Sequence, residues 1–316
     1  MKEQVTETFG EPRKKSGKKY WTTLTVLLFL ALVLVITGVA MGGSLINPSR
    51  WSGFSIGSGN ISNLDIGNLQ LANSDEEVEG SSYRTLYENV ANLRVESGAI
   101  STVIREWDGS GINVDTSNLS RNARRQLNVS QNGDTLNINS GDFGRVQILG
   151  INFVNEILVI QIPAGLELES VYLETGAGQL KLEYMVANEL EMTVGAGQMD
   201  ATHLLAQELF VTIGAGQGEI GRFEAENVKL SVGAGQLNAT GIVHHRADID
   251  CGVGEIVLDV IGRQEDFEYS ISVGIGEATF GGMTIAGLGR DTSGNLGMDK
   301  KIDVIVGIGS VTVNFR

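Results

Sequence analysis

A Gly-x-Gly unit that returns at a fixed spacing constrains the fold of this 316-residue chain more than any other feature. The gaps between the first glycines are 19 residues for the first five units, then 22 and 33. A fixed period of this length indicates stacked repeats, each a single supersecondary unit. The units read GAGQ four times, then GVGE, GIGE and GIGS, with first glycines Gly176, Gly195, Gly214, Gly233, Gly252, Gly274 and Gly307.

Apolar and polar residues alternate on both sides of each unit. The residues five, three and one before the first glycine are apolar, as in Leu190, Met192 and Val194, and so are the residues four and six after it, as in Leu180 and Leu182. This alternation is typical of strands with one buried face. The parity of the buried positions changes across the glycines, which requires a bulge or a corner. Each unit is therefore predicted to run strand, glycine corner, strand and a loop back.

A unit of this length cannot bury its own apolar face, so the units are expected to stack in parallel around one core. The alanines between the glycines, such as Ala196, predict a tight interior there, and the glutamine after the second glycine predicts a hydrogen-bonded ladder. The predicted fold is all-β, a parallel β-solenoid (single-stranded β-helix-like) with rungs of about 19 residues. Its predicted corners are Gly176, Gly178, Gly195, Gly197, Gly214, Gly216, Gly233, Gly235, Gly252, Gly254, Gly274, Gly276, Gly307 and Gly309.

The same pattern continues upstream of the first full unit. Leu93, Val95 and Ser97 precede Gly98 at the expected positions, so the repeat domain is predicted to begin near residue 91 and to run to 316. Residues 126–139 predict a hairpin that turns at Asn132-Gly133. Residues 151–162 predict a strand that leads into a proline. The 33-residue gap makes the last unit less regular than the others.

The N-terminal part contains an uncharged apolar stretch. Residues 21–41 (WTTLTVLLFLALVLVITGVAM) are long enough to span a bilayer as a helix, and the basic run RKKSGKK precedes them. This asymmetry predicts a cytoplasmic tail at 1–20, a transmembrane helix at 21–41 and an extracellular remainder. The rival reading is a cleaved signal peptide, whose apolar region is usually shorter. Residues 42–90, rich in Ser, Gly and Asn, are expected to be a linker or lead-in.

The charge of the chain argues against one class of partner, and its cysteine content excludes an intramolecular disulfide. The net charge of the chain is −15. Residues 1–41 have a net charge of +3, so the remainder has a net charge of −18. So acidic a surface argues against nucleic acid as a partner. The one cysteine, Cys251, cannot form an intramolecular disulfide and falls in a predicted core column.

Other motifs give little sign of catalysis or of a cofactor. A strand rather than a helix follows each Gly-x-Gly, unlike in nucleotide-binding loops. Asp250, Glu255 and Glu277 are a candidate calcium site if the two glutamates stack in one column, although solvated surface acids are the simpler interpretation. The histidines at 203, 244 and 245 are expected in loops, the adjacent pair pointing to opposite faces. No catalytic, cofactor-binding or other metal-binding residue is predicted.

The series TGAGQLKL, TVGAGQMDA, IGAGQGEI, DCGVGEIVLDV and DVIVGIGSVTVNF resembles the bacterial "putative adhesin" family of β-strand-repeat domains. It is also similar to the toast-rack domains of membrane proteins linked to cell-wall antibiotic responses. The resemblance covers residues 91–316. It implies a stacked β-helix-like fold and a location at the cell surface, typically of Gram-positive bacteria. It carries over no catalytic residue, because this is a domain family of unknown function.

The sequence therefore favours a non-enzymatic, single-pass cell-membrane protein that acts as an adhesin or envelope-binding scaffold. Its expected partners are the membrane and either a cell-wall glycan or another envelope membrane protein. The first alternative is a membrane-tethered sensor or modulator of cell-envelope stress signalling. The second is an enzyme that acts on polysaccharides, as some β-helix proteins do.

Overall fold

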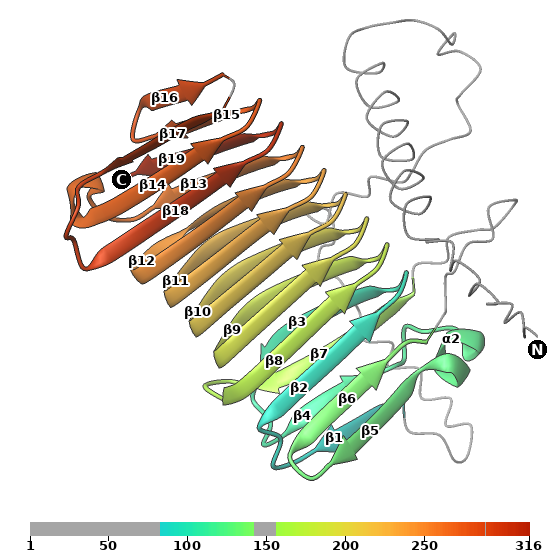
Figure 1. Cartoon of the computed structure of the whole chain (residues 1–316). Helices are drawn as coiled ribbons and strands as arrows, with labels where there is room; N and C mark the ends of the chain where they lie inside the picture. Colours follow the sequence, from blue (N-terminus) through green and yellow to red (C-terminus); the bar gives the residue numbers. More distant parts are fainter. Residues whose placement is uncertain (1–82, 142–155, 288) are drawn as a thin grey trace, which may run out of the picture. The chain divides into compact units, whose positions relative to one another are not determined.

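The computed structural model describes residues 83–141, 156–287 and 289–316, and this part is almost entirely β-structure (Figure 1). The first elements are β1 (Arg84–Tyr87), β2 (Asn92–Ser97), β3 (Ser101–Trp107), β4 (Ile112–Asp115), α2 (Arg121–Gln126), β5 (Asn128–Asn132), β6 (Thr135–Asn139), β7 (Ile157–Pro163) and β8 (Glu167–Thr175). The middle ones are β9 (Gln179–Val194), β10 (Gln198–Ile213), β11 (Gln217–Val232) and β12 (Gln236–Cys251). The last are β13 (Glu255–Val260), the 3-10 turn η4 (Gln264–Asp266), β14 (Phe267–Val273), β15 (Glu277–Phe280), β16 (Met283–Ala286), β17 (Arg290–Gly294), β18 (Lys300–Val306) and β19 (Ser310–Phe315).

The four middle strands confirm the predicted parallel stacking. Each has 16 residues, and β9, β10 and β11 pair in parallel at an offset of 19, as in Leu190 with Leu209 and Leu209 with Val228. Between β11 and β12 the register shifts by one residue near Phe223 and returns at Asn227. The apolar residues of all these rungs form one core cluster. The fold is thus solenoid-like, with 19-residue rungs.

A continuous strand closes each middle rung, where the sequence predicted a loop back. In β9 the buried residues are Leu180 and Leu182, then Met185 and Ala187, then Leu190, Met192 and Val194. The buried parity changes twice, at the outward pairs 183–184 and 188–189. Two consecutive outward residues bend a strand without breaking its ladder, as a bulge does. The prediction of a loop was therefore wrong, because these bends need no glycine or proline.

The glycine corners are in place, but the reason for glycine differs from the expected one. The corner glycines do not have the positive φ that only glycine adopts easily. Instead, a Cβ on Gly216 would overlap the carbonyl oxygen of Gly197 in the preceding rung, and a Cβ on Gly214 would lie 2.7 Å from the Gly195 oxygen. Backbone hydrogen bonds continue through the corner, as from Ala196 N to the Gly176 oxygen at 2.7 Å. Glycine is required by the close approach of successive rungs.

The residue between the two glycines points outward. Ala177, Ala196 and Ala215 are exposed, so the prediction of a tight interior at this column was wrong. The corner presses backbone against backbone, which turns the intervening side chain to the solvent. The glutamine ladder is present in part: Gln179 Nε2 donates to Gln198 Oε1 at 3.4 Å, and Gln236 Nε2 to Glu255 Oε2 at 3.3 Å.

The order of the last rungs in space differs from their order in the chain. Strand β18 pairs with β12 on one side and with β14 on the other, and β19 lies likewise between β13 and β15 (Figure 1). The rung made of β18 and β19, called here the inserted rung, therefore separates two units that are consecutive in sequence. The antiparallel strands β16 and β17 cover the free sides of β15 and β14. The 33-residue gap supplies these two covering strands.

At the other end, the upstream prediction holds with small changes. Strand β2 pairs in parallel with β8, which places Gly176 against Gly98. Strands β5 and β6 form the predicted hairpin, although its turn residues are Gly133 and Asp134 rather than Asn132 and Gly133. Strand β1, within the expected lead-in, pairs with β4, and helix α2 was not predicted.

Residues 42–82 of the expected lead-in, the expected transmembrane helix at 21–41 and the basic tail lie outside the described residues, as does the start of the predicted strand at 151–162. In the described part of the chain, no helix is long and apolar enough to cross a membrane.

Adding one methyl group at a corner tests the close-approach argument. Gly216→Ala is expected to destabilise the protein by about 1–3 kcal/mol, because the new Cβ forces adjacent rungs apart. Ala215→Ser, in the same corner but exposed, is the matched control and is expected to leave the melting temperature unchanged. Equal melting temperatures for Gly216→Ala and the unchanged chain would contradict the assignment.

Candidate interaction face

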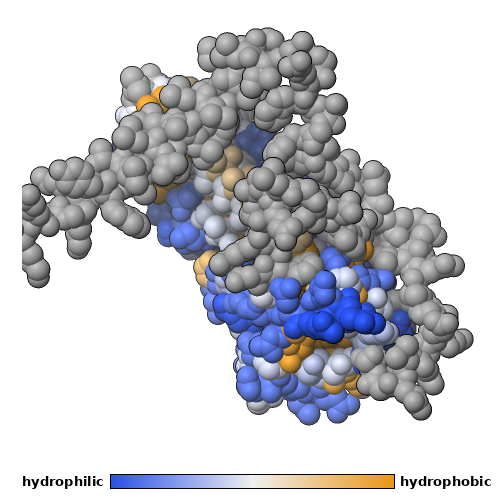
Figure 2. Space-filling model, turned by 90° about the vertical axis from the view of Figure 1, so that its right-hand side faces the viewer, coloured by the Kyte–Doolittle hydropathy of each residue, from blue (hydrophilic) through white to orange (hydrophobic). Residues whose placement is uncertain are grey.

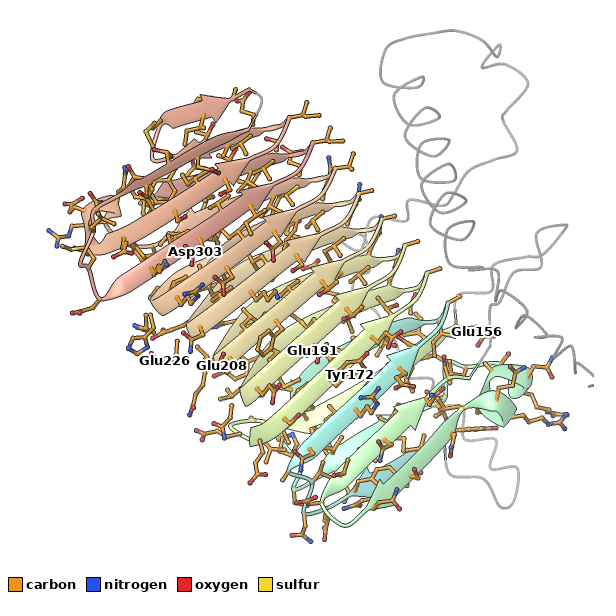
Figure 3. All side chains as sticks on the ribbon, in the orientation of Figure 1. Glu156, Tyr172, Glu191, Glu208, Glu226 and Asp303 are labelled. Carbon is orange, nitrogen blue, oxygen red and sulfur yellow. The ribbon has the colours of Figure 1, made fainter. Side chains whose placement is uncertain are left out.

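In the segments that precede the glycine corners, every second side chain points outward. Outward side chains at the same position of successive rungs form a row. One row runs in register through the neighbouring strands β2, β8, β9, β10, β11, β12 and β18, four residues before Gly98, Gly176, Gly195, Gly214, Gly233, Gly252 and Gly307. We call the outward surface of the segments of these strands that directly precede the corners the interaction face. Its central row consists of Arg94, Tyr172, Glu191, Phe210, Lys229, Asp248 and Asp303. Tyr172, Glu191 and Asp303 are labelled on it in Figure 3.

At one end of the face, Tyr172 is the centre of a polar cluster. The Arg94 guanidinium lies over the Tyr172 ring, 4.0 Å from its centroid, and the Arg94 Nε donates to Glu96 at 2.7 Å. The Tyr172 hydroxyl donates to Glu174 at 2.7 Å. This hydrogen bond, burial and the nearby Glu174 charge raise the pKa of Tyr172 to about 12, against the opposing charge of Arg94. The phenol therefore stays protonated and donating at neutral pH.

At the other end, a charged network joins the neighbouring strands β12 and β18. Arg246 donates to Asp248 on its own strand at 2.8 Å and to Asp303 on β18 at 2.6 Å. Lys301 lies 3.4 Å from Asp303. The hydrogen bond from Arg246 to Asp248 and the two carboxylates raise the pKa of Arg246, while burial opposes them. These pairs hold the outward side chains of the inserted rung in a fixed arrangement.

In the middle of the face, the central row carries an aromatic ring between two charged side chains. Phe210 is half-buried, with Glu191 on one neighbouring strand and Lys229 on the other. Beside it, Asn227 donates to Glu208 at 2.7 Å. A flat sheet with an aromatic ring between opposite charges suits an extended ligand that combines apolar and polar groups. The row has no motif of its own in the sequence and was not predicted, although its spacing from the glycines identifies it.

The histidines lie on strands, not in loops as predicted. His203 is in β10, where its ring meets Tyr184 edge-on with centroids 5.3 Å apart. His244 and His245 both face outward because they occupy a bend of β12, so they do not point to opposite faces as expected. Each meets a different carboxylate: His244 Nε2 lies 3.0 Å from Glu224 and His245 Nδ1 lies 2.6 Å from Glu226.

The candidate calcium site is not assembled as the sequence predicted. Ser310 of β19 lies between Glu255 and Glu277, because the inserted rung separates their strands. Asp250 pairs with Ile305 on that side. The expectation that the two glutamates are stacked neighbours was therefore wrong. Within residues 83–141, 156–287 and 289–316, no group of three or more His, Cys, Asp or Glu side chains could hold a metal ion.

Two buried carboxylates were not foreseen, and both support the chain around α2. Asp115 accepts from Arg84 Nε and from the Ser117 amide, each at 2.9 Å. Burial raises the pKa of Asp115, but these hydrogen bonds and the Arg84 charge outweigh it, so the pKa is lowered. Glu156, near α2 in Figure 3, accepts from the Ser120 amide at 2.5 Å. Both acids have structural partners and do not converge on the interaction face.

Cys251 is buried in the core, as predicted, at 3% exposure. Burial raises the pKa of its thiol, which favours the protonated thiol in the folded chain. The outer surface is different in kind: the uncovered part of the side shown in Figure 2 is mostly hydrophilic, with small hydrophobic areas between.

Stacked parallel rungs with glycine corners define a solenoid-like β-strand-repeat domain. The family model for Toastrack DUF4097 matches residues 90–276, more than half of the chain. The chain belongs to this family, in agreement with the resemblance seen in the sequence.

Among solved structures, the chain is similar to an adhesin, described as putative, from Bacteroides fragilis, with 12% identity, 73% of this chain and 94% of that chain covered, and a TM-score of 0.39. It is also similar to a cell adhesion protein, likewise described as putative, from Clostridium sporogenes, with 12% identity, coverage of 74% and 98%, and a TM-score of 0.33. Such scores carry no argument about function. No curated protein matches the chain.

The raised pKa of Tyr172 predicts a change of stability at alkaline pH. The fold favours the protonated phenol, so its contribution is fully present below pH 10 and is lost as the pH rises through about 12. The melting-temperature advantage of the unchanged chain over Tyr172→Phe is therefore expected to shrink across this interval. In a Glu174→Ala background, where the acceptor is missing, the same comparison is expected to show no such pH dependence. An advantage that stays constant from pH 9 to 12 would count against the Tyr172–Glu174 bond.

Proposed function

We propose that this protein is a non-enzymatic, membrane-anchored cell-surface protein that binds an extended envelope component through the interaction face. The observation that carries the proposal is the in-register row from Arg94 to Asp303 on seven neighbouring strands. At a strand spacing of roughly 4.8 Å, this row is about 29 Å long. Its length suits a linear polymer better than a small molecule.

The ligand we propose is a cell-wall glycan. A glycan chain offers apolar ring faces and many hydroxyl groups, which match the ring of Phe210 and the amide and carboxylate of Asn227 and Glu208 beside it. The rigid backbone ladder supports this function, because a preformed face loses little entropy when an extended ligand binds. The proposed membrane anchor is the apolar segment 21–41, which would hold the repeat domain at the outer surface of the cell membrane.

The alternative function is a sensor or modulator of envelope stress, whose partner is another membrane protein. In this function the signal would pass to that partner protein across the membrane. The two functions differ in what the interaction face holds, and one binding experiment with two fractions separates them.

Retention of the full-length chain in detergent micelles is measured on purified cell wall and on solubilised membranes. The face variant combines Glu191→Lys with Phe210→Ser. The matched control combines Asp200→Lys with Val257→Ser, which again replaces an acid by lysine and an apolar residue by serine, at half-buried outward positions in the segments that follow the corners. The face variant is expected to lose retention on the wall about tenfold, equivalent to about 1.4 kcal/mol of binding free energy. The control is expected to keep it.

Equal retention of both variants on the wall would reject the interaction face as the binding surface. No wall retention by the unchanged chain, together with capture of one membrane protein that the face variant fails to capture, would replace the adhesin proposal with the sensor. Melting temperatures of both variants establish that the comparison is between folded proteins.

A further inference from the structure

The inserted rung occupies a slot with two open sheet edges. Its strand β18 completes the ladders of β12 and β14, and β19 completes those of β13 and β15. Its inward residues Ile302, Val304, Val306, Val311 and Val313 are at most 2% exposed and belong to the core. Emptying the slot would leave buried backbone groups unpaired on both sides, so the slot demands an occupant of the same pattern.

The covalent link to this rung is a short exposed connector, residues 295–299, between β17 and β18. Its closed form places Asn295 at φ 51° and Gly297 at φ 91°, both in the left-handed region. Hydrogen bonds attach it to the preceding rung: Asn295 Nδ2 donates to the Gln264 oxygen at 3.2 Å and Gly297 N donates to Glu268 Oε2 at 2.9 Å. The connector is therefore held weakly in comparison with the rung that it delivers.

The connector also carries apolar side chains that pack on little. Leu296 is 74% exposed and Met298 is 44% exposed. Contact between exposed apolar side chains of two copies removes apolar surface from water, which stabilises the contact. Two connectors that cross between two copies of the chain would bring these four side chains together.

We infer that the inserted rung is exchanged between two copies of this chain, each copy filling the slot of the other. A second copy supplies an identical rung, so every ladder and core contact of the rung is reproduced in the dimer. Opening of the connector relieves the left-handed conformation at Asn295 and buries Leu296 and Met298. The partner is thus a second copy, and the inference does not rest on the proposed function.

The single native cysteine provides a direct test. Cys251 on β12 lies in register with Val306 of the inserted rung and, on its other side, with Val232 of β11, which is not exchanged. Neighbouring strands lie roughly 4.8 Å apart, within the Cα separations that disulfides accept. In the exchanged dimer, Val306→Cys would form disulfides between chains, whereas Val232→Cys would form them within a chain.

The full-length chain in detergent micelles is unfolded, refolded over a range of concentrations, oxidised and separated on a non-reducing gel. Val306→Cys is expected to give a covalent dimer that grows with concentration, while Val232→Cys stays monomeric. Only monomer from Val306→Cys at every concentration, or the same dimer from both variants, would overturn the inference.

A second variant keeps the test decisive if neither disulfide forms. Gly297→Val strains the closed connector, because a side chain at φ 91° is disfavoured, and leaves the rung itself unchanged. Its dimer fraction by size-exclusion chromatography is expected to rise several-fold over that of the unchanged chain. An unchanged dimer fraction for Gly297→Val would also overturn the inference.

Discussion

Contact between the backbones of successive rungs at the corners controls the rest of this structure. The second glycine of each unit places its Cα where the carbonyl oxygen of the previous rung excludes any Cβ. The amides on either side still complete the ladder, as Gln198 N does with the Gly178 oxygen at 3.0 Å. Because the ladder is unbroken at the corner, the strand segments on both sides of it are in register from rung to rung. That register in turn aligns the core columns on the inside and the rows of the interaction face on the outside.

Inward and outward side chains of the stacked strands contribute differently to the structure. Inward residues such as Leu190, Leu209 and Val228 bury apolar surface, which is the main source of stability. Outward residues are free to vary, since the backbone holds their strands in place, and they form local pairs such as Tyr172 with Glu174. The face therefore owes its geometry to the corners and its chemistry to residues that the fold does not require. A family of this kind can keep one architecture and change what it binds.

Much of the fold could be predicted from the sequence because glycine spacing and period-2 alternation are local signals. The corners, the parallel offset of 19 and the beginning of the repeat near Gly98 all followed from them. The bends at 183–184 and 188–189 were missed because outward residue pairs resemble ordinary polar positions. The interaction face was missed as a site because it has no motif of its own and appears only once the strands are in register.

The position of the inserted rung could not be predicted, because units with the same pattern are compatible neighbours and alternation does not choose among them. This position also has a consequence for how the molecule is made. Residues 300–315 leave the ribosome after both of the rungs that they separate. The rungs therefore cannot stack in the order in which they are synthesised. The rung of β14 and β15 must either wait without its neighbour or pair provisionally with β12 and β13 and then give way. Because the inserted rung is synthesised last, this end of the stack can reach its final arrangement only after the chain has been extended through residue 315.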